Sequence, residues 1–188
     1  MGGVKPVVAL GAIGLVALAF AVARTEPGED ALTQPFATHV EPGERGEGRN
    51  VVAVVDGWQL ADRVTLRSWT GETTGVWLVV DTRMGTVTRG KLAYAELRVG
   101  DRLWTPSLRA GLGSMQSTSL DAGLPMAGSF VFELPAELLE DPDAARAVLR
   151  LSTDSDPRMD SVVELELDLT TLPGEAEHEV APSERTRW

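Results

Sequence analysis

The feature that most constrains this chain is an uncharged apolar run over residues 6–23, PVVALGAIGLVALAFAVA. A helix rises about 1.5 Å per residue, so a run of this length spans roughly 27 Å, close to the thickness of a bilayer's hydrocarbon core. Lys5 and the amino terminus precede the run, and Arg24 follows it. A short basic N-terminus is expected to stay in the cytoplasm. The sequence therefore predicts a single-pass transmembrane signal anchor over residues 1–24, with the remainder of the chain outside the cytoplasm.

The same run leaves a second interpretation open, a cleavable signal peptide. Ala21-Val22-Ala23 has the small-x-small form that signal peptidase accepts, and cleavage following Ala23 would release a secreted protein. The apolar run is longer than the core of a usual signal peptide, which favours retention in the cell membrane. Both interpretations place the following domain outside the cytoplasm.

Composition excludes several kinds of chemistry. The chain contains no cysteine, which excludes disulfides, thiolate metal sites, thiol catalysis and lipid attachment at a cysteine. Its formal net charge is −11, and a surface of that sign repels phosphate backbones. Nucleic-acid binding is therefore not expected.

Residues 25–49 are predicted to form a flexible linker. They hold three prolines, four glycines and many charges, a composition that cannot bury enough apolar surface to offset the entropy of an ordered chain. Such a segment would act as a tether between membrane and domain. His39 lies alone in it, so we expect a solvated side chain there, since metal sites need several converging groups.

From residue 50 to residue 172 the pattern changes to short strands. Phe130, Phe132 and Leu134 alternate with their neighbours, and a period of two places one strand face on a core and the other in solvent. The stretch VWLVV at residues 76–80 is apolar throughout, as expected of a central strand covered on both faces. Further strands are expected at residues 51–55, 63–67, 92–99, 115–120, 148–151 and 162–169. About eight short strands separated by Gly, Asp and Pro predict an all-β domain, a β-sandwich.

Two segments depart from the strand pattern. Residues 135–147, PAELLEDPDAARA, are predicted to form one or two helical turns divided by Pro142. Residues 173–188 are charged and lack periodicity, which predicts a disordered tail. Trp188 is then either part of an untethered terminus or a docking element.

Three sequence blocks carry a resemblance to a known family. They are TGVWLVVDTRM at residues 74–84, LRVGDRLWTPS at residues 97–107 and LDAGLPMAGSFVFELP at residues 120–135. In order and spacing they resemble the bacterial domain family DUF4352, related to a mycobacterial immunoprotective secreted antigen. The family commonly carries Asn after its central strand, where this chain has Asp81. The resemblance implies an exported, often membrane- or lipid-anchored sandwich of immunoglobulin-like fold, and it implies no catalytic residues.

An acidic stretch provides the candidate metal ligands, which are Asp154, Asp156 and Asp160. Calcium takes about six to eight oxygen ligands, and acids spaced along a loop can supply several of them. The central Gly and closing Glu of an EF-hand loop are absent here. An ordinary acidic turn between strands explains the same residues without a metal, and the sequence implies no cofactor.

Acid–base catalysis would need Glu164, Glu166 and Asp168, whose two-residue spacing puts them on one strand face. That face is the predicted solvent face, whereas catalytic carboxylates need at least one desolvated member. We therefore expect a charged surface that discourages aggregation at the sheet edge.

Nucleophilic catalysis has little support either. Ser114 does not lie in a G-x-S-x-G elbow, and both histidines, His39 and His178, fall in predicted unstructured segments. The sequence thus predicts that the protein is not an enzyme.

The tryptophans are assigned by their position in the strand pattern. Trp77 is expected in the core, and Trp104, which follows a Gly-Asp turn, is expected to be half-buried. Trp58 and Trp69 flank the strand near residue 64, where they could pack at the rim of the core or form an exposed binding patch.

Together these features predict a membrane-anchored, extracytoplasmic, non-catalytic binding module of the bacterial cell envelope. The membrane would be contacted through residues 6–23, and an envelope protein through loops 106–114 and 121–128. Two alternatives are a calcium-dependent or carboxylate-based envelope enzyme, and a purely structural subunit of a membrane complex.

Overall fold

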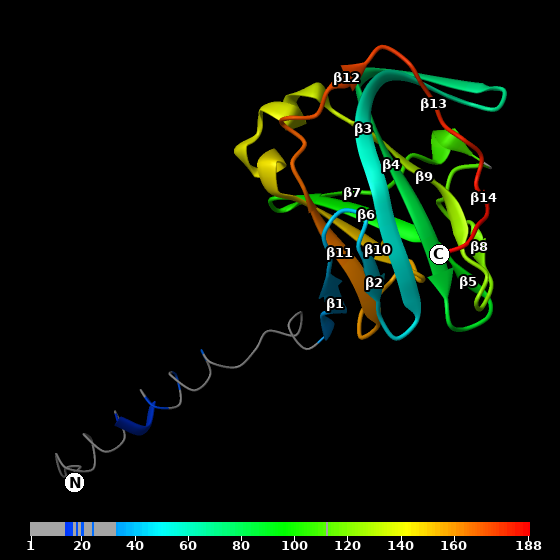
Figure 1. Ribbon diagram of the computed structural model, residues 1–188. Coiled ribbons are helices and arrows are strands. Elements are labelled where there is room, and N and C mark those ends of the chain that lie inside the picture. Colours follow the sequence, from blue (N-terminus) through cyan, green and yellow to red (C-terminus); the bar gives the residue numbers. More distant parts are fainter. Residues whose placement is uncertain (1–13, 17, 19, 21–23, 25–32, 112) are drawn as a thin grey trace, which may run out of the picture. The chain divides into compact units, whose positions relative to one another are not determined.

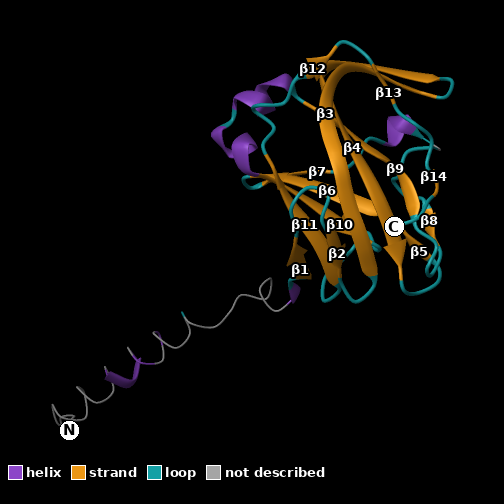
Figure 2. Cartoon of the chain, in the orientation of Figure 1, coloured by secondary structure: helices purple, strands orange, loops and turns teal. Residues whose placement is uncertain are grey.

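The computed structural model describes residues 14–16, 18, 20, 24, 33–111 and 113–188. The chain divides into two units, Met1–Gln34 and Pro35–Trp188. The second unit is built from two stacked β-sheets, with helical structure confined to short 3-10 turns (Figures 1 and 2). The fold is thus an all-β sandwich, as the strand pattern predicts.

Sheet A has five strands. In spatial order they are β1 (Phe36–His39), β11 (Ser161–Leu167), β10 (Ala147–Ser152), β6 (Tyr94–Val99) and β7 (Arg102–Trp104). Strand β1 pairs with β11 in parallel, and the other pairs are antiparallel.

Sheet B is organised around two long strands that form a hairpin, β3 and β4. Its main path runs β12 (Gly174–Glu175), β3 (Val51–Leu66), β4 (Trp69–Thr86), β9 (Met126–Leu134) and β14 (Glu184–Arg185). Two further short strands, β2 (Arg45–Glu47) and β13 (His178–Glu179), also pair with β3. A separate two-stranded ladder joins β5 (Lys91–Leu92) to β8 (Ser119–Leu120).

The inner core lies between the two sheets. It is filled by every second side chain of the strands, because side chains alternate between the two faces of a sheet. In β4 the inward side chains are Val76, Leu78 and Val80, and in β9 they are Phe130 and Phe132. From the other sheet, Leu149, Leu151, Val163, Leu165 and Leu167 contribute. The alternation predicted for residues 130–134 is therefore confirmed.

A second, smaller cluster covers the opposite face of sheet B, and we call it the outer core. It consists of Ala61, Val64, Leu66, Trp77, Val79, Ala110, Val131 and Val180, with Trp69 packed against it. Trp77 is completely buried there, although it points away from the inner core. The prediction that the strand at residues 76–80 is covered on both faces is thus correct. The expectation that Val131 faces solvent is wrong, because the outer core buries it.

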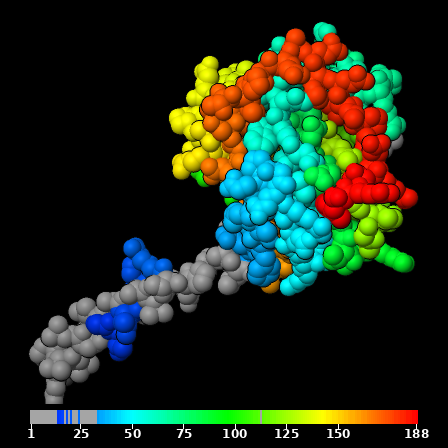
Figure 3. Space-filling view, viewed as in Figure 1, coloured from blue at the N-terminus to red at the C-terminus, as the bar shows by residue number. Residues whose placement is uncertain are grey.

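The C-terminal segment supplies part of that cover. The prediction of a disordered tail at residues 173–188 is therefore wrong. Strands β12 and β13 pair in parallel with β3, and β14 then pairs with β9 at the other side of the sheet. Between them Val180 is only 2% exposed, and its N–H donates to the carbonyl of Thr65 at 2.8 Å. Figure 3 shows these residues, in orange and red, lying over the cyan surface of β3.

The predicted linker over residues 25–49 is also wrong in its second half. Strand β1 pairs with sheet A and strand β2 with sheet B, so this stretch ties the two sheets together. Gly46 of β2 packs so tightly that an added Cβ would lie 2.6 Å from Val163 Cγ1. A side chain at this position would therefore displace the inner core.

Other boundaries differ in detail from the strand pattern. The two strands expected at 51–55 and 63–67 are one continuous strand, β3, with register shifts after Val55 and Ala61. Of the strand expected at 115–120, only β8 forms. The helical turns expected at 135–147 are η2 (Ala136–Glu140) and η3 (Pro142–Arg146), divided at Asp141 as Pro142 predicts. A further 3-10 turn is η1 (Leu108–Ala110).

Most of the predicted membrane span lies outside the described residues. Of residues 6–23, the structure describes 14–16, 18 and 20, all of them helical. Within the part of the chain that is described, no helical segment combines the length and the hydropathy needed to cross a bilayer.

Because Val180 seals the outer core, we expect Val180→Asp to destabilise the fold. Placing an unpaired carboxylate against Trp77 and Val64 should lower the free energy of unfolding by about 3 kcal/mol. The matched control is Ala181→Asp at the exposed neighbouring position, with an expected change below about 0.5 kcal/mol. Urea denaturation measures both, and equal effects of the two substitutions would show that the C-terminal segment is not docked.

Candidate functional site

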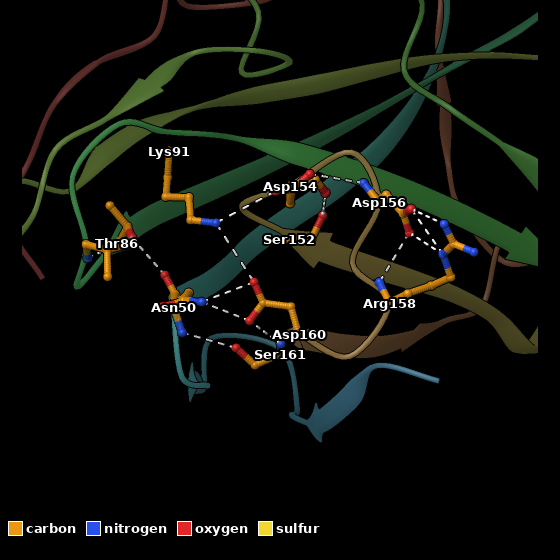
Figure 4. A network of polar contacts seen from close by, with 10 residues as sticks. Asn50, Thr86, Lys91, Ser152, Asp154, Asp156, Arg158, Asp160 and Ser161 are labelled. Atoms are coloured by element: carbon orange, nitrogen blue, oxygen red, sulfur yellow. Dashed lines mark hydrogen bonds and ion pairs between the residues drawn. The ribbon is translucent and has the colours of Figure 1, made fainter. Parts of the chain in front are cut away.

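The loop between β10 and β11 carries the three candidate calcium ligands, and the structure pairs each of them with a cation (Figure 4). Arg158 donates to Asp156 through Nε at 2.8 Å and Nη2 at 2.5 Å. Asp154 and Asp160 both face Lys91, whose Nζ lies 3.7 and 3.9 Å from their Oδ2 atoms. Among the residues that the structure describes, no three His, Cys, Asp or Glu side chains are arranged to hold a metal ion.

Asp160 also connects the loop to the first residues of sheet B. Asn50 Nδ2 donates to both carboxylate oxygens of Asp160 at 2.9 and 3.1 Å, and the N–H of Ser161 donates to Oδ1 at 2.8 Å. The carbonyl of Asn50 in turn accepts a hydrogen bond from Thr86 Oγ1 at 2.8 Å. This network therefore links the β10–β11 loop of sheet A to the start of β3 and the end of β4 in sheet B.

The same contacts set the acidity of the two most engaged carboxyl groups. Partial burial acts to raise the pKa of Asp160, but the hydrogen bonds from Ser161 and Asn50 and the charges of Lys91 and Arg49 outweigh it, so the pKa is lowered. The pKa of Asp156 is lowered by its hydrogen bonds from Arg158. Both carboxylates are thus held in the charged form by the chain itself.

The outer face of sheet A carries a row of ionisable side chains across four strands. Arg150 Nε and Nη2 donate to Glu164 Oε1 at 2.8 and 2.7 Å, and Arg150 Nη1 lies 3.7 Å from Glu96. On the other side, His39 Nδ1 lies 3.6 Å from Glu164, while the His39 side chain is 78% exposed. The solvated histidine is confirmed, although it belongs to β1. The expectation that Glu164 is solvent-exposed is wrong, since it is buried between its neighbours.

The other two acids of this segment do not join the row. Glu166 is exposed, and Asp168, beyond the end of β11, accepts hydrogen bonds from the N–H and Oγ1 of Thr170 at 2.8 and 2.7 Å. The three acids therefore do not converge on a common point where a substrate could react.

A groove of about 340 Å³ lies on the outer face of sheet B beside the C-terminal segment. Strands β3, β4 and β9 supply one side, and residues 178–184 supply the other. Its lining residues are Asp56, Asp81, Thr82, Ala127, Gly128, Ser129, His178, Glu179, Ala181, Pro182 and Glu184. The volume is in the range of small-ligand pockets, which is about 300–1,000 Å³.

The groove is acidic. Of its four carboxylates, Asp56 is neutralised by Arg83, whose Nη2 lies 2.6 Å from Asp56 Oδ1. Glu179 and Glu184 are exposed, and their side chains make no hydrogen bond or ion pair within the described residues. These two carboxylates therefore present uncompensated negative charge at the rim, which favours a cationic ligand.

Ser129, Asp81 and His178 all line the groove, but they do not form a catalytic triad. Ser129 Oγ donates to Asp81 Oδ1 at 2.5 Å. A ring nitrogen of His178 is 2.7 Å from Gln59 Nε2, and Nδ1 lies 3.5 Å from Glu175. The described contacts include no hydrogen bond between Ser129 and His178, and a triad requires the base to bond the nucleophile. No local sequence pattern indicates this grouping, because Asp81, Ser129 and His178 come from the separate strands β4, β9 and β13.

The tryptophans mainly serve packing. Trp77 is in the outer core, and Trp69 meets it edge to face, with ring centroids 5.7 Å apart. Trp58 and Trp104 are partly buried against the inner core. The predictions for Trp77 and Trp104 are confirmed, and Trp58 and Trp69 follow the packing alternative. Trp188 is 40% exposed.

The two loops predicted to contact a partner are attached to different strands of sheet B. Loop 106–114 runs beside the middle of β9, where the N–H of Ser107 donates to the carbonyl of Val131, and its Leu108 is 82% exposed. Loop 121–128 lies at the end of β4, where the N–H of Gly123 donates to the carbonyl of Thr86.

Known proteins give a structural similarity but no family for this chain. No sequence family and no curated protein matches the chain. Among solved structures, the chain is similar to an uncharacterized beta-sandwich protein from Clostridium difficile 630, with 11% sequence identity and a TM-score of 0.49. The similarity covers 76% of this chain and 99% of that one.

Because the chain stabilises the charged form of Asp160, we expect Asp160→Asn to cost stability in a pH-dependent way. A lowered folded-state pKa contributes stability above the unfolded pKa of about 3.9, and this contribution is lost as the pH falls through the folded value. The variant should lose about 1.5 kcal/mol near neutral pH and much less near pH 3.

Urea denaturation at the two pH values measures this difference. The control is Asp101→Asn, because Asp101 is exposed and makes no hydrogen bond or ion pair within the described residues. A loss for Asp160→Asn that is the same at both pH values would contradict the charge argument.

Proposed function

We propose that the protein is a membrane-anchored, extracytoplasmic, non-catalytic binding module of the bacterial cell envelope. The observation that carries the binding part is the acidic groove, which is formed by sheet B and the C-terminal segment paired with it. The membrane part is supported by the uncharged run at residues 6–23 and the basic residue before it.

The ligand class follows from the charge of the groove. Glu179 and Glu184 have no partner within the described residues, so a cationic group can neutralise them without breaking an existing ion pair. The groove is acidic, and a flexible basic segment of an envelope protein is complementary to that charge. We therefore propose such a segment as the ligand.

We also propose that the sandwich is immunoglobulin-like and of the DUF4352 kind. Two of the three blocks that resemble the family fall on strands that pair in sheet B, and the third falls on a hairpin of sheet A. Residues 74–84 lie in β4, residues 97–107 include the β6–β7 turn, and residues 120–135 include β9.

The topology can be tested with a single reactive thiol, because the chain has no cysteine. Ala145→Cys lies at an exposed position in η3. In intact cells this thiol should react with a membrane-impermeant maleimide, and the purified protein should have the mass of the uncleaved chain. Labelling only after lysis would refute the extracytoplasmic placement, and a mass lacking residues 1–23 would replace the anchor with a cleaved signal.

The groove can be tested by photo-crosslinking from the exposed position Ala181. A crosslinker there should capture an envelope partner, whereas the same group at Ala145 should not. Reversing both free charges, with Glu179→Lys and Glu184→Lys, should weaken capture by about tenfold, or about 1.4 kcal/mol. Capture that is unchanged by the reversal, or equal from both positions, would refute the groove as the binding site.

A further inference from the structure

One end of the sandwich gathers segments from six parts of the chain, and we call it the basal end. It comprises residues 35–36, 48–50, 86–92, 121–125, 153–161 and 185–188. Hydrogen bonds tie them together, from Phe36 N to the Asp160 carbonyl at 2.8 Å and from Thr186 N to the Pro125 carbonyl at 2.9 Å. In Figure 1 the start of β1 and the turns that follow β2, β4 and β10 lie together at the lower end of the domain.

Exposed apolar side chains are concentrated at this end. Among residues 35–111 and 113–188, eight large hydrophobic side chains are exposed, and six of them belong to the basal end. The six are Phe36, Val87, Leu92, Leu124, Met159 and Trp188. Only Leu103 and Leu108 lie elsewhere in those ranges. Such a concentration marks an interaction surface, because scattered exposed residues would be spread over the whole domain.

The basal end also differs in charge from the rest of the domain. Residues 35–188 hold 15 bases and 25 acids, of which the basal end holds six bases and four acids. The bases are Arg49, Arg89, Lys91, Arg158, Arg185 and Arg187, and the acids are Asp121, Asp154, Asp156 and Asp160. The remainder then carries nine bases and 21 acids, so a weakly positive end lies on a strongly negative domain.

Not all of these charges are free to act on a partner. The pairs that Arg158 and Lys91 make with acids of the β10–β11 loop largely cancel locally. Arg89 and Arg187, in contrast, are exposed, and their guanidinium groups make no ion pair within the described residues. In the sequence, Arg89 lies two residues from Val87 and Arg187 precedes Trp188. The Trp188 ring packs against Gly85, with the Arg45 guanidinium 4.6 Å from its centroid, and it stays 40% exposed.

From these observations we propose that the basal end docks on the surface of an anionic lipid bilayer. Arginine beside tryptophan and aliphatic side chains is the combination that binds the headgroup layer, since the cations meet lipid phosphates and the apolar groups enter the interface. The acidic remainder is repelled by the same surface, so the electrostatic field of the domain orients this end towards the lipid.

The position at which the chain enters the domain favours a bilayer over a protein as the partner of the basal end. This step rests on the proposed function, in which residues 6–23 are anchored in the membrane. Residues 24–34 then form the whole connection, and they can span at most about 40 Å. The connection enters the domain at residue 35, within the basal end, which keeps this end close to the membrane surface.

The test uses the full chain reconstituted in lipid nanodiscs, with Ala122→Cys labelled by a fluorophore and with doxyl-labelled lipid as quencher. Ala122 is an exposed position in the basal end, and Ala145→Cys in η3 is the matched control. With phosphatidylglycerol in the nanodisc, the label at 122 should be quenched and the label at 145 should not. In pure phosphatidylcholine, quenching at 122 should fall, because the charge attraction is lost.

Charge variants sharpen the result. Each basic residue near an anionic surface strengthens association about fivefold, so Arg89→Glu together with Arg187→Glu should release the basal end and remove most of the quenching at 122. A basal end that is shielded in solution without quenching by lipid would indicate a second protein molecule and would overturn the proposal. Equal quenching at 122 and 145 would overturn it as well.

The nanodisc experiment distinguishes an error in the proposed membrane anchor from an error in the proposed docking of the basal end. If the protein floats with nanodiscs but the label at 122 is not quenched, the docking is refuted and the anchor stands. If the protein does not float with nanodiscs of either composition, the anchor is refuted, and the docking falls with it.

Discussion

Strand β4 is buried on both faces, and the arrangement of the remaining chain depends on this. Leu78 and Val80 point into the inner core, whereas Trp77 and Val79 point to the opposite side of sheet B. Burying a tryptophan removes roughly 200 Å² of surface from water, worth about 5 kcal/mol before other terms are counted. If the outer face of sheet B were exposed to solvent, this stabilisation would be lost. The C-terminal segment and η1 cover it, and the groove exists because the same segment then passes beside β4 and β9.

The strand pattern gave the sandwich, the inward faces of β4 and β9, and the division of the helical turns at Pro142. It missed the strands at both ends of the domain for a physical reason. Strands β1, β2, β12, β13 and β14 are two to four residues long and gain order by pairing with strands already in place. Each short segment needs only one anchor, such as Gly46 or Val180, and one anchor produces no periodicity.

In the candidate site too, the sequence predicts local features but not contacts between residues far apart in the chain. The acids of the β10–β11 loop are visible in the sequence, but the groups that neutralise them come partly from distant positions. Lys91 and Asn50 reach Asp160 only because β5 and the start of β3 fold against that loop. Likewise, Glu164 is buried because the register of β10 and β11 places Arg150 beside it. Pairing of this kind depends on register, which a run of residues does not specify.

Under the export proposed above, the position of the last strands in the sequence has a consequence for folding. Strands β12, β13 and β14 follow every strand of both sheets in the sequence, yet Val180 between them completes the outer core. Until these last residues arrive, Trp77 has an incomplete cover and sheet B cannot reach its final stability. If the chain crosses a translocation channel from its N-terminal side, as that proposal requires, sheet B is complete only after residues 174–185 have left the channel. Pairing of β12, β13 and β14 with sheet B would then be the last step in the folding of the domain.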